Sequence, residues 1–367
     1  MRISKLPFPN SFKIPNNFQD FRTSDLLERG VFFSFKNPGL PFSLPIGSMV
    51  RDNLTRLVRE SHEGMDALHI EIPSYMKREV LNDGTEIQDT FERKFVTLPS
   101  PMEKYIGLTT HEMEIVDWLN RDTVSYRTLP LRLFFYKSLL RPIKDPRGIL
   151  KLREFEVCAM LSLDEDRRRF GLSLNQYESA CEGLFDRLGI KATKRKRGEN
   201  VRRGPHLDFD LEYFYKCPEG DNVNWDDQQN KALSLAMGYE YVPRVRSLKF
   251  TNDKNENVFP VLGSFSMGIE RMLYSAFDAS RDSRGFDLPE EIRPFDTSVL
   301  MFGDSEDVYA RTREVYEKIR SEGGRVLLDD RRTRRTTKAK FSDYIGVPKK
   351  IIVSSAGVRE VGRDEVN

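Results

Sequence analysis

The chain has 367 residues, of which 38% are hydrophobic and 32% are charged, and its formal net charge is +2. The chain is longer than one hydrophobic core usually organises, so we predict a globular protein with two domains. The sequence has no apolar run of the ~18 residues that would cross a bilayer, no apolar secretory signal and no Cys/His cluster of the kind that holds zinc. We therefore expect a cytoplasmic protein with reduced cysteines, no membrane contact and no metal site built from a cluster of protein side chains.

The first three quarters of the chain mix helical and strand-like patterns. Residues 38–47 are rich in proline and glycine, which excludes a helix there. Apolar spacing predicts a helix over residues 48–63. Further helices are expected over residues 112–120, over 176–188, where acidic and basic faces alternate, and over 267–276. Strand-like runs are predicted over residues 67–72, 93–108, 131–136 and 149–161, and they recur up to residue 265 with a turn at 252–255. The basic segment 191–203 lacks apolar periodicity, so we expect an exposed loop, and the mixture as a whole predicts an α+β domain.

The last quarter of the chain alternates between strands and helices. The polar, proline-bounded stretch 280–294 is interpreted as a linker. After it come a strand at 299–302, a helix at 308–321 and strands at 325–328 and 350–353, with a further helix between these two strands. This alternation is typical of a small α/β domain with a partly parallel sheet. We therefore predict two domains, residues 1–285 and 286–367.

A short loop precedes the helix predicted at 112–120 and reads Leu108-Thr109-Thr110-His111-Glu112. One interpretation is a helix start, in which Thr110 caps the helix and Glu112 complements its positive end. The other is a binding loop, in which a buried carboxylate holds a substrate ammonium and a neighbouring hydroxyl adds a hydrogen bond. The loop alone leaves both interpretations open.

Two cation-bearing segments lie around the turn of the predicted hairpin. The first reads Lys137-Ser138-Leu139-Leu140-Arg141-Pro142-Ile143, and the second reads Gly148-Ile149-Leu150-Lys151-Leu152-Arg153-Glu154-Phe155. Phe155 is either a core aromatic or a surface on which a planar base could stack.

A glycine- and serine-containing run, Gly263-Ser264-Phe265-Ser266-Met267-Gly268, leads into a helix that carries Arg271. Small residues allow a ligand to lie close to the backbone, and an arginine beyond them can contact a phosphate. The alternative is a surface arginine on an amphipathic helix.

A basic run follows Asp329-Asp330 in the last quarter: Arg331-Arg332-Thr333-Arg334-Arg335-Thr336-Thr337-Lys338. Such a run either forms a solvated face or supplies contacts to nucleic-acid phosphates.

Taken in chain order, these segments resemble the prolyl-tRNA synthetases, a branch of the class II aminoacyl-tRNA synthetases. The run Pro41 to Gly47, the helix after it and Glu71-Ile72-Pro73 resemble the family's first motif, which builds its dimer interface, so the resemblance implies a homodimer. Residues 322–331 and 340–353 resemble the anticodon-binding domain that the prolyl, threonyl, histidyl and glycyl enzymes share. The fold implied is an antiparallel-sheet catalytic domain followed by a small α/β anticodon-binding domain.

The resemblance also implies site residues and partners. The amino acid would contact Thr110, Glu112 and His206, the last in Gly204-Pro205-His206. ATP, with Mg²⁺, would contact Arg141, Arg153, Phe155, Ser264 and Arg271. Transfer RNA would contact Arg331, Arg332, Arg334, Arg335 and Lys338. The substrate implied is proline, and a loop histidine exposed to solvent is the alternative interpretation of His206.

The sequence departs from the family in the first half of the second motif. A gap-free register puts Leu140 where the family has its α-phosphate arginine and Pro142 where it has a glutamate that reads adenine. A shift of one residue restores Arg141 but puts Ile143 in place of the glutamate. Lys144 and Arg147 are the other candidates to replace the arginine. The interval between the second and third motifs is too short for the large editing insertion of many bacterial prolyl enzymes, so none is expected.

Three functions remain open on these grounds. The first is ATP-dependent activation of an amino acid, most simply proline, and its ligation to tRNA. The second is a synthetase-like paralogue without ligase activity that binds tRNA as an accessory protein. The third is an adenylate-forming enzyme that loads another acceptor, although an anticodon-like domain argues against it.

Overall fold

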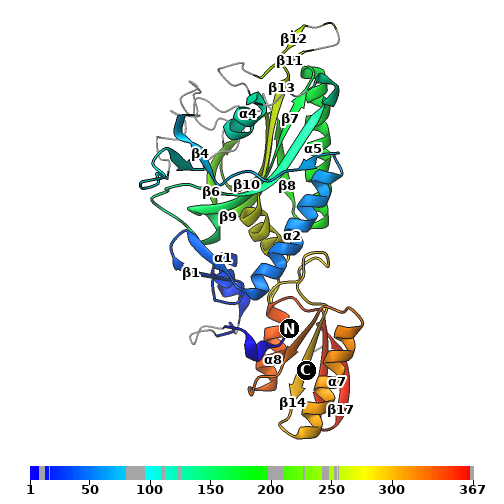
Figure 1. Cartoon of the computed structure of the whole chain (residues 1–367). Coiled ribbons are helices and arrows are strands. Elements are labelled where there is room, and N and C mark those ends of the chain that lie inside the picture. Colours follow the sequence, from blue (N-terminus) through cyan, green and yellow to red (C-terminus); the bar gives the residue numbers. More distant parts are fainter. Residues whose placement is uncertain are drawn as a thin grey trace.

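The computed structural model describes residues 1–7, 13–15, 17–79, 96–108, 112–121, 125–196, 210–225, 228–241, 248–251, 254 and 256–363. Within these residues the chain forms a large sheet covered by helices and a smaller sheet built from the last quarter of the chain. Figure 1 shows the large sheet in the upper part of the molecule and the small one below it.

The large sheet has seven strands in the order β3-β6-β7-β13-β10-β9-β8. Every neighbouring pair is antiparallel except β3 with β6. The strands, in chain order, are β3 (Leu68–His69), β6 (Leu131–Leu140), β7 (Glu154–Asp164), β8 (Ala192–Lys196), β9 (Leu211–Trp225), β10 (Gln228–Tyr241) and β13 (Val261–Gly268). A mixed fold with a large antiparallel sheet confirms the α+β prediction for this part of the chain.

The central strand β7 shows how the sequence places two cores on the two faces of this sheet. Side chains alternate between faces along a strand. Cys158 and Met160 accordingly belong to one hydrophobic cluster, while Ala159 and Leu161 belong to a second one. Almost the whole strand is buried, because both faces are covered.

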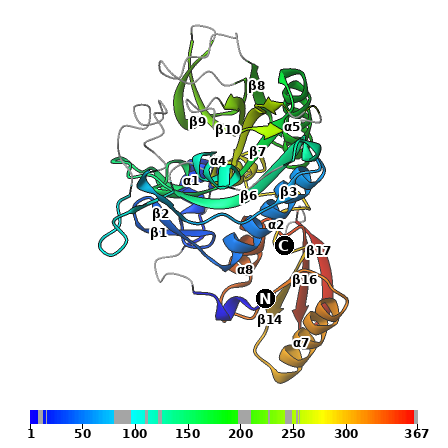
Figure 2. The same cartoon turned by 45° about the horizontal axis from the view of Figure 1, so that its top comes forward.

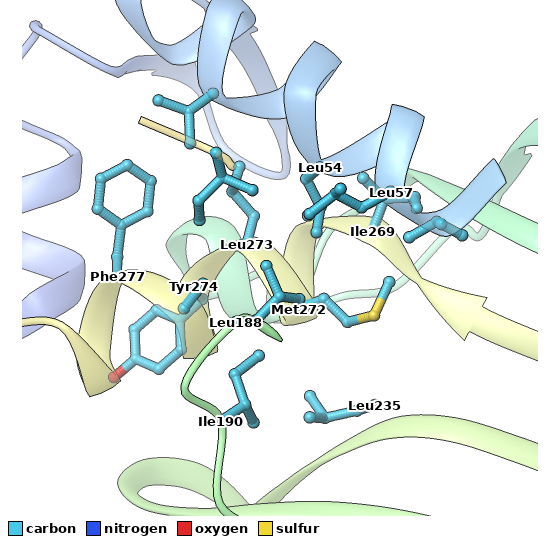
Figure 3. Packing of buried hydrophobic residues seen from close by; sticks show 14 of the residues in the cluster. Leu54, Leu57, Leu188, Ile190, Leu235, Ile269, Met272, Leu273, Tyr274 and Phe277 are labelled. Carbon is cyan, nitrogen blue, oxygen red and sulfur yellow. The ribbon is translucent and has the colours of Figure 1, made fainter. Parts of the chain in front are cut away.

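One face of the sheet is covered by the helices α2 (Pro45–Glu63), α5 (Arg167–Arg187) and α6 (Ile269–Ala279). Leu54 and Leu57 of α2 pack near Ile269 and Leu273 of α6 in this core (Figure 3). On the other face lies α4 (Glu112–Arg121), whose apolar side chains belong to the second cluster. All four helices were predicted from the sequence, although α5 begins nine residues earlier than expected.

The start of α2 corrects one prediction. Residues 38–47 were expected to be non-helical, yet the helix already includes Pro45 and Gly47. Proline is tolerated in the first turn, because the amide hydrogen it lacks would have no partner within the helix.

Shorter elements frame the large sheet. The N-terminal part contains α1 (Thr23–Leu27) and a hairpin of β1 (Phe33–Asn37) with β2 (Leu40–Ser43). Two further pairs are β4 (Tyr75–Lys77) with β5 (Tyr105–Gly107), and β11 (Phe250–Thr251) with β12 (Asn257–Val258). Single turns of 3-10 helix occupy Ile3–Lys5, Phe18–Asp20, Tyr126–Thr128 and Gly148–Leu150.

The small sheet confirms the alternating pattern expected for the last quarter. Its order is β15-β14-β16-β17, with the first three strands parallel and β17 antiparallel at the edge. The elements are β14 (Thr297–Phe302), α7 (Glu306–Ser321), β15 (Val326–Asp329), α8 (Arg335–Tyr344), β16 (Lys349–Ser354) and β17 (Gly357–Gly362).

Two segments differ from expectation. The first part of the predicted basic loop forms β8, an edge strand in which the Lys194 ammonium binds Glu178 at 2.6 Å and Glu182 at 2.8 Å. Charged side chains are common on edge strands, where they discourage further pairing, so the absence of apolar periodicity was misleading. Residues 197–203 of this prediction lie outside the described residues.

The predicted linker is the second difference. Although residues 280–294 form no helix or strand, Phe286, Leu288 and Ile292 are buried in the main cluster. The N-terminus also reaches across: the Met1 ammonium donates to the Val326 carbonyl at 2.8 Å, and Figure 1 shows this end beside the small sheet. The division at residues 285 and 286 stays a prediction.

Candidate functional site

The hairpin of β6 and β7 places Arg141 beside Phe155. Leu139 pairs with Phe155 and Leu140 with Glu154, and the Arg141 amide then donates to the Arg153 carbonyl at 2.7 Å. Because facing residues of antiparallel strands share a side of the sheet, Arg141 follows Leu139 onto the side of Phe155. Its guanidinium carbon lies 4.8 Å from the centre of the Phe155 ring, within range of a cation–π contact.

Glu112 begins α4 and is almost completely buried, with 3% of its surface exposed. Its Oε1 accepts hydrogen bonds from the Tyr239 hydroxyl at 2.6 Å and the Ser264 hydroxyl at 2.8 Å. Tyr239 and Ser264 face each other across β10 and β13, so the sheet aims both donors at one carboxylate. Burial, and then the Glu112 charge, raise the pKa of Tyr239 well above its usual value, which keeps this donor protonated.

Arg141, Arg271 and Glu112 form one electrostatic group. Burial, and then the Arg271 charge, lower the pKa of Arg141 to about 10, and the Glu112 carboxylate opposes both effects. Two cations and one buried anion thus come from the residue after β6, from α6 and from α4. Such a site can bind a ligand that carries both a cationic and an anionic group.

Arg271 lies in the first turn of α6, where its side chain reaches the β9–β10 hairpin. It donates to the Asp221 carboxylate at 3.1 Å and to the Ser234 carbonyl at 3.4 Å. Arg147, from the turn between β6 and β7, pairs with the same Asp221 carboxylate. Sequence reasoning missed both Asp221 and Tyr239.

Arg153 has a different environment from the other predicted ATP contacts. Its guanidinium donates to the carbonyl groups of Ile143 at 3.1 Å and Pro38 at 3.0 Å. In this structure it therefore braces the turn between β6 and β7 against the β1–β2 hairpin. Thr110 and His206, predicted to contact the amino acid, lie outside the described residues.

A model of the tRNA synthetase class II core domain (G, H, P, S and T) matches residues 98–279. This chain carries a class II tRNA synthetase core domain. The match confirms the resemblance to class II tRNA synthetases, and Glu112, Arg141, Tyr239, Ser264 and Arg271 all fall inside the matched residues.

Sequence similarity to known proteins also extends beyond the core domain, over the rest of the chain. The proline–tRNA ligase of Caulobacter sp. (strain K31) is 23% identical over 415 residues, covering 98% of this chain and 92% of the relative. The proline–tRNA ligase of Bartonella bacilliformis is 24% identical over 425 residues, covering 100% of this chain and 94% of the relative. The similarity thus continues through both sheets.

Solved structures share the fold. The prolyl-tRNA synthetase of Giardia lamblia in complex with prolyl-adenylate has a TM-score of 0.77 at 21% identity, over 93% of this chain and 71% of that one. The enzyme of Cryptosporidium parvum complexed with halofuginone and AMPPNP has a TM-score of 0.74 at 16% identity, over 94% and 71% of the two chains.

The basic run 331–338 lies beyond the core domain, in the small sheet unit. Arg332, Arg334 and Arg335 are exposed, and the Arg335 guanidinium carbon lies 5.2 Å from the centre of the Phe302 ring. Arg331 pairs with Asp329 at 2.6 Å and packs over Phe341. The exposed part of this run is a candidate nucleic-acid surface.

Lys338 does not belong to that exposed surface, contrary to the prediction. Only 3% of its surface is exposed, and its ammonium donates to the carbonyl groups of Met301 and Asp329. Burial lowers the pKa of Lys338, although Asp329 opposes this effect. The amphipathic pattern of α8 explains the difference, because Lys338 lies on the helix face that packs against β14.

Three further properties concern the described residues as a whole. Among them, no group of three His, Cys, Asp or Glu side chains is arranged to hold a metal ion. None of the described helices combines the length and the apolar character that a bilayer crossing requires. Cys158, Cys181 and Cys217 are buried thiols.

Proposed function

We propose that this chain is a prolyl-tRNA synthetase, which activates proline with ATP and transfers it to tRNA. The observation that carries the proposal is the buried Glu112 carboxylate, which accepts hydrogen bonds from Tyr239 and Ser264 and whose charge raises the pKa of Arg141 against burial. The names of the relatives and the prolyl-adenylate in the Giardia structure support this function.

In this mechanism a negative side chain binds the ammonium end of the amino acid, and positive side chains act where its carboxylate reacts. Glu112 accepts hydrogen bonds from the substrate ammonium, a charge-assisted contact that is stronger than a neutral one. The substrate carboxylate then attacks the α-phosphorus of ATP, a new P–O bond forms, and the bond to pyrophosphate breaks. Arg141 and Arg271 stabilise the negative charge that develops on the phosphates.

The second step transfers the acyl group. The 3′-terminal ribose hydroxyl of tRNA attacks the carbonyl carbon of the aminoacyl-adenylate and AMP leaves. No covalent enzyme intermediate is needed, so catalysis consists of positioning and charge stabilisation.

ATP would stack its adenine on the partly buried ring of Phe155. Mg²⁺ usually binds through nucleotide phosphates and only one or two carboxylates. The described residues fit that arrangement better than a protein cage, since they contain no cluster of three metal ligands. The Cryptosporidium structure with AMPPNP supports nucleotide binding in this fold.

We also propose that residues 286–367 bind tRNA through Arg331, Arg332, Arg334 and Arg335, and that the protein is a cytoplasmic homodimer that pairs through the region of α2. Phosphate contacts release counter-ions, so tRNA affinity should fall steeply as salt rises. Replacing Arg332, Arg334 and Arg335 together with alanine should weaken tRNA binding and flatten this salt dependence, without affecting amino-acid activation. A tRNA affinity that does not change with salt concentration would contradict the proposed tRNA-binding surface.

The test of ligase activity is the exchange of labelled pyrophosphate into ATP with each amino acid in turn. We expect exchange with proline alone, and its loss in Arg271→Ala. Arg168→Ala, which removes an exposed arginine of α5, is the matched control and should retain full activity. If no amino acid supports pyrophosphate exchange, the proposed ligase activity is rejected.

One observation favours the alternative of a non-catalytic accessory protein. The two family positions of the second motif hold Leu140, which is partly buried at the end of β6, and Pro142, which is exposed. Neither can bind a phosphate through its side chain. Tight tRNA binding without any exchange activity would support the accessory function, whereas proline-dependent exchange would mean that Arg141, Lys144 or Arg147 replaces the family arginine.

A further inference from the structure

The strand β9 contains a large bulge next to the candidate site. Lys216 pairs with Ala232 of β10, and the next pair on the ladder is Asn222 with Lys231. Residues 217–221 therefore leave the ladder between two adjacent partners. Bulges of this kind redirect side chains and are common beside active sites.

Gly220 allows this bulge to lie flat against the neighbouring strand. A Cβ atom at this position would stand 2.5 Å from the backbone of Ala232, closer than real side chains come. The glycine thus lets Glu219 and Asp221, on either side of it, project away from the ladder towards other elements.

Glu219 links the bulge to two helices through hydrogen bonds. Its carboxylate accepts hydrogen bonds from the Tyr274 hydroxyl of α6 at 2.7 Å and from the Ser24 hydroxyl of α1. The bulge is consequently fixed relative to α6, the helix that carries Arg271.

Asp221 is aimed at two guanidinium groups from different elements. One carboxylate oxygen pairs with Arg147, and the other pairs with Arg271 at 3.1 Å. Arg147 also donates to the Glu219 carbonyl at 3.4 Å. Two arginines that converge on one anion form the arrangement that binds phosphate groups.

Both ion pairs of Asp221 are partly exposed to solvent. The side chains of Asp221, Arg147 and Arg271 are 37%, 42% and 28% exposed, so solvent screens their interactions. A polyphosphate carries several negative charges and more acceptor oxygens than one carboxylate, so it can displace Asp221 from both partners.

We propose that Asp221 is an internal counter-ion that competes with the ATP polyphosphate for Arg147 and Arg271. Binding of the polyphosphate then moves this carboxylate off both arginines. The inference deepens the proposed function and rests on it, and it adds Arg147 to the residues that contact phosphate.

The test is calorimetric titration of the full chain with inorganic tripolyphosphate in buffer that contains EDTA. Removing the competing charge in Asp221→Asn should tighten binding about two- to tenfold, the range expected for one or two screened ion pairs. Arg147→Ala and Arg271→Ala should both weaken binding. Asp186→Asn, which removes an exposed carboxylate of α5, should bind within about twofold of wild type.

The outcomes separate this inference from the proposed function. If Asp221→Asn keeps its thermal midpoint but binds tripolyphosphate equally or more weakly than wild type, the counter-ion proposal is overturned. Proline-dependent exchange by wild type would still support the proposed ligase function. If wild type and Asp221→Asn bind neither tripolyphosphate nor ATP and support no exchange, both proposals fail. Asp221→Ser serves as a second variant if the asparagine substitution lowers the thermal midpoint.

Discussion

At the scale of single residues, the Glu112 carboxylate is the group on which amino-acid recognition depends. Glu112→Gln keeps the shape and can still accept from Tyr239 and Ser264, but it loses the charge that would hold an ammonium. A hydrogen bond to a charged group contributes about 1.5–3 kcal/mol, so we expect kcat/KM for proline to fall roughly 10- to 150-fold. Pyrophosphate exchange at varied proline concentration measures this, and the KM for ATP should change little.

Tyr239→Phe provides the comparison, because it removes one donor and leaves the charge. A neutral hydrogen bond contributes about 1 kcal/mol, so the loss should be about fivefold. If Glu112→Gln keeps full activity, or loses no more than Tyr239→Phe, the carboxylate does not bind the substrate.

Part of this residue-level picture could be predicted from the sequence. Glu112, Ser264 and Arg271 were identified from local motifs, although the contact between Glu112 and Ser264 spans 152 positions. Tyr239 and Asp221 were missed because their placement depends on strand register and on a bulge. Pro218 and Gly220 inside a strand-like run were the available signal, since both residues mark bulges in strands.

At the scale of elements, the first turn of α2 depends on Gly47. A Cβ atom there would lie 2.1 Å from the Phe32 carbonyl oxygen, which accepts the Leu44 amide. Gly47→Ala should therefore lower the free energy of unfolding by about 1–3 kcal/mol, the usual range for overpacking. Gly183→Ala in α5 is the matched control: a Cβ atom there would meet nothing within 4 Å, so helix propensity alone should stabilise the protein by up to ~1 kcal/mol. Thermal melts of both variants test the pair, and equal shifts would contradict the close approach.

Three elements also meet at Glu270 of α6. Its carboxylate accepts the Glu156 amide of β7 at 3.0 Å and lies 3.5 Å from Arg51 of α2. Burial raises the pKa of Glu270 from 4.5 to about 7. Arg51 and the backbone amides of Glu270 and Glu156 oppose this shift, while the Glu156 carboxylate charge adds to it. Because the folded protein keeps this proton where the unfolded chain has lost it, the stability contributed here falls as pH rises from about 4.5 to 7.

Glu270→Gln stays neutral and should therefore be more stable than wild type at pH 8, by on the order of 1–3 kcal/mol. At pH 4.5 the two proteins should differ little. Chemical denaturation at both pH values measures the difference, with Glu314→Gln on the exposed side of α7 as the control. A glutamine variant that is less stable than wild type at pH 8 would mean that the ion pair with Arg51 outweighs burial.

Element types were easier to predict than element ends. Apolar spacing identified α2, and α4, α5 and α6 were also expected as helices; each of them buries one stripe of side chains. The start of α2 and the strand β8 were missed, because capping by proline and pairing at a charged edge leave no apolar pattern.

At the scale of the whole molecule, the two sheets share one core. The main hydrophobic cluster joins Leu26 and Phe32 of the N-terminal part to Phe341 and Tyr344 of α8. The view in Figure 2 shows α8 close to the lower end of α2. Sequence reasoning expected a polar linker between separate domains, since composition alone does not reveal that Phe286 packs against the Phe32 ring. Such a buried connection indicates that the two units do not move independently.

Tyr344 tests this coupling directly. Its hydroxyl donates to the Leu26 carbonyl at 2.6 Å. The centre of its ring lies 5.4 Å from the ring centre of Phe18 and 5.7 Å from that of Phe32. Tyr344→Ala should cost about 3–5 kcal/mol, whereas Tyr344→Phe should cost only the hydrogen bond, about 1 kcal/mol. Lys340→Ala, on the exposed side of the same helix, should have little effect. In calorimetry we expect wild type to unfold in one transition, and hydrogen exchange should show that Tyr344→Ala weakens protection in the large sheet as well as the small one. Two separate wild-type transitions, or a large sheet that Tyr344→Ala leaves untouched, would mean that the shared core does not couple the two units.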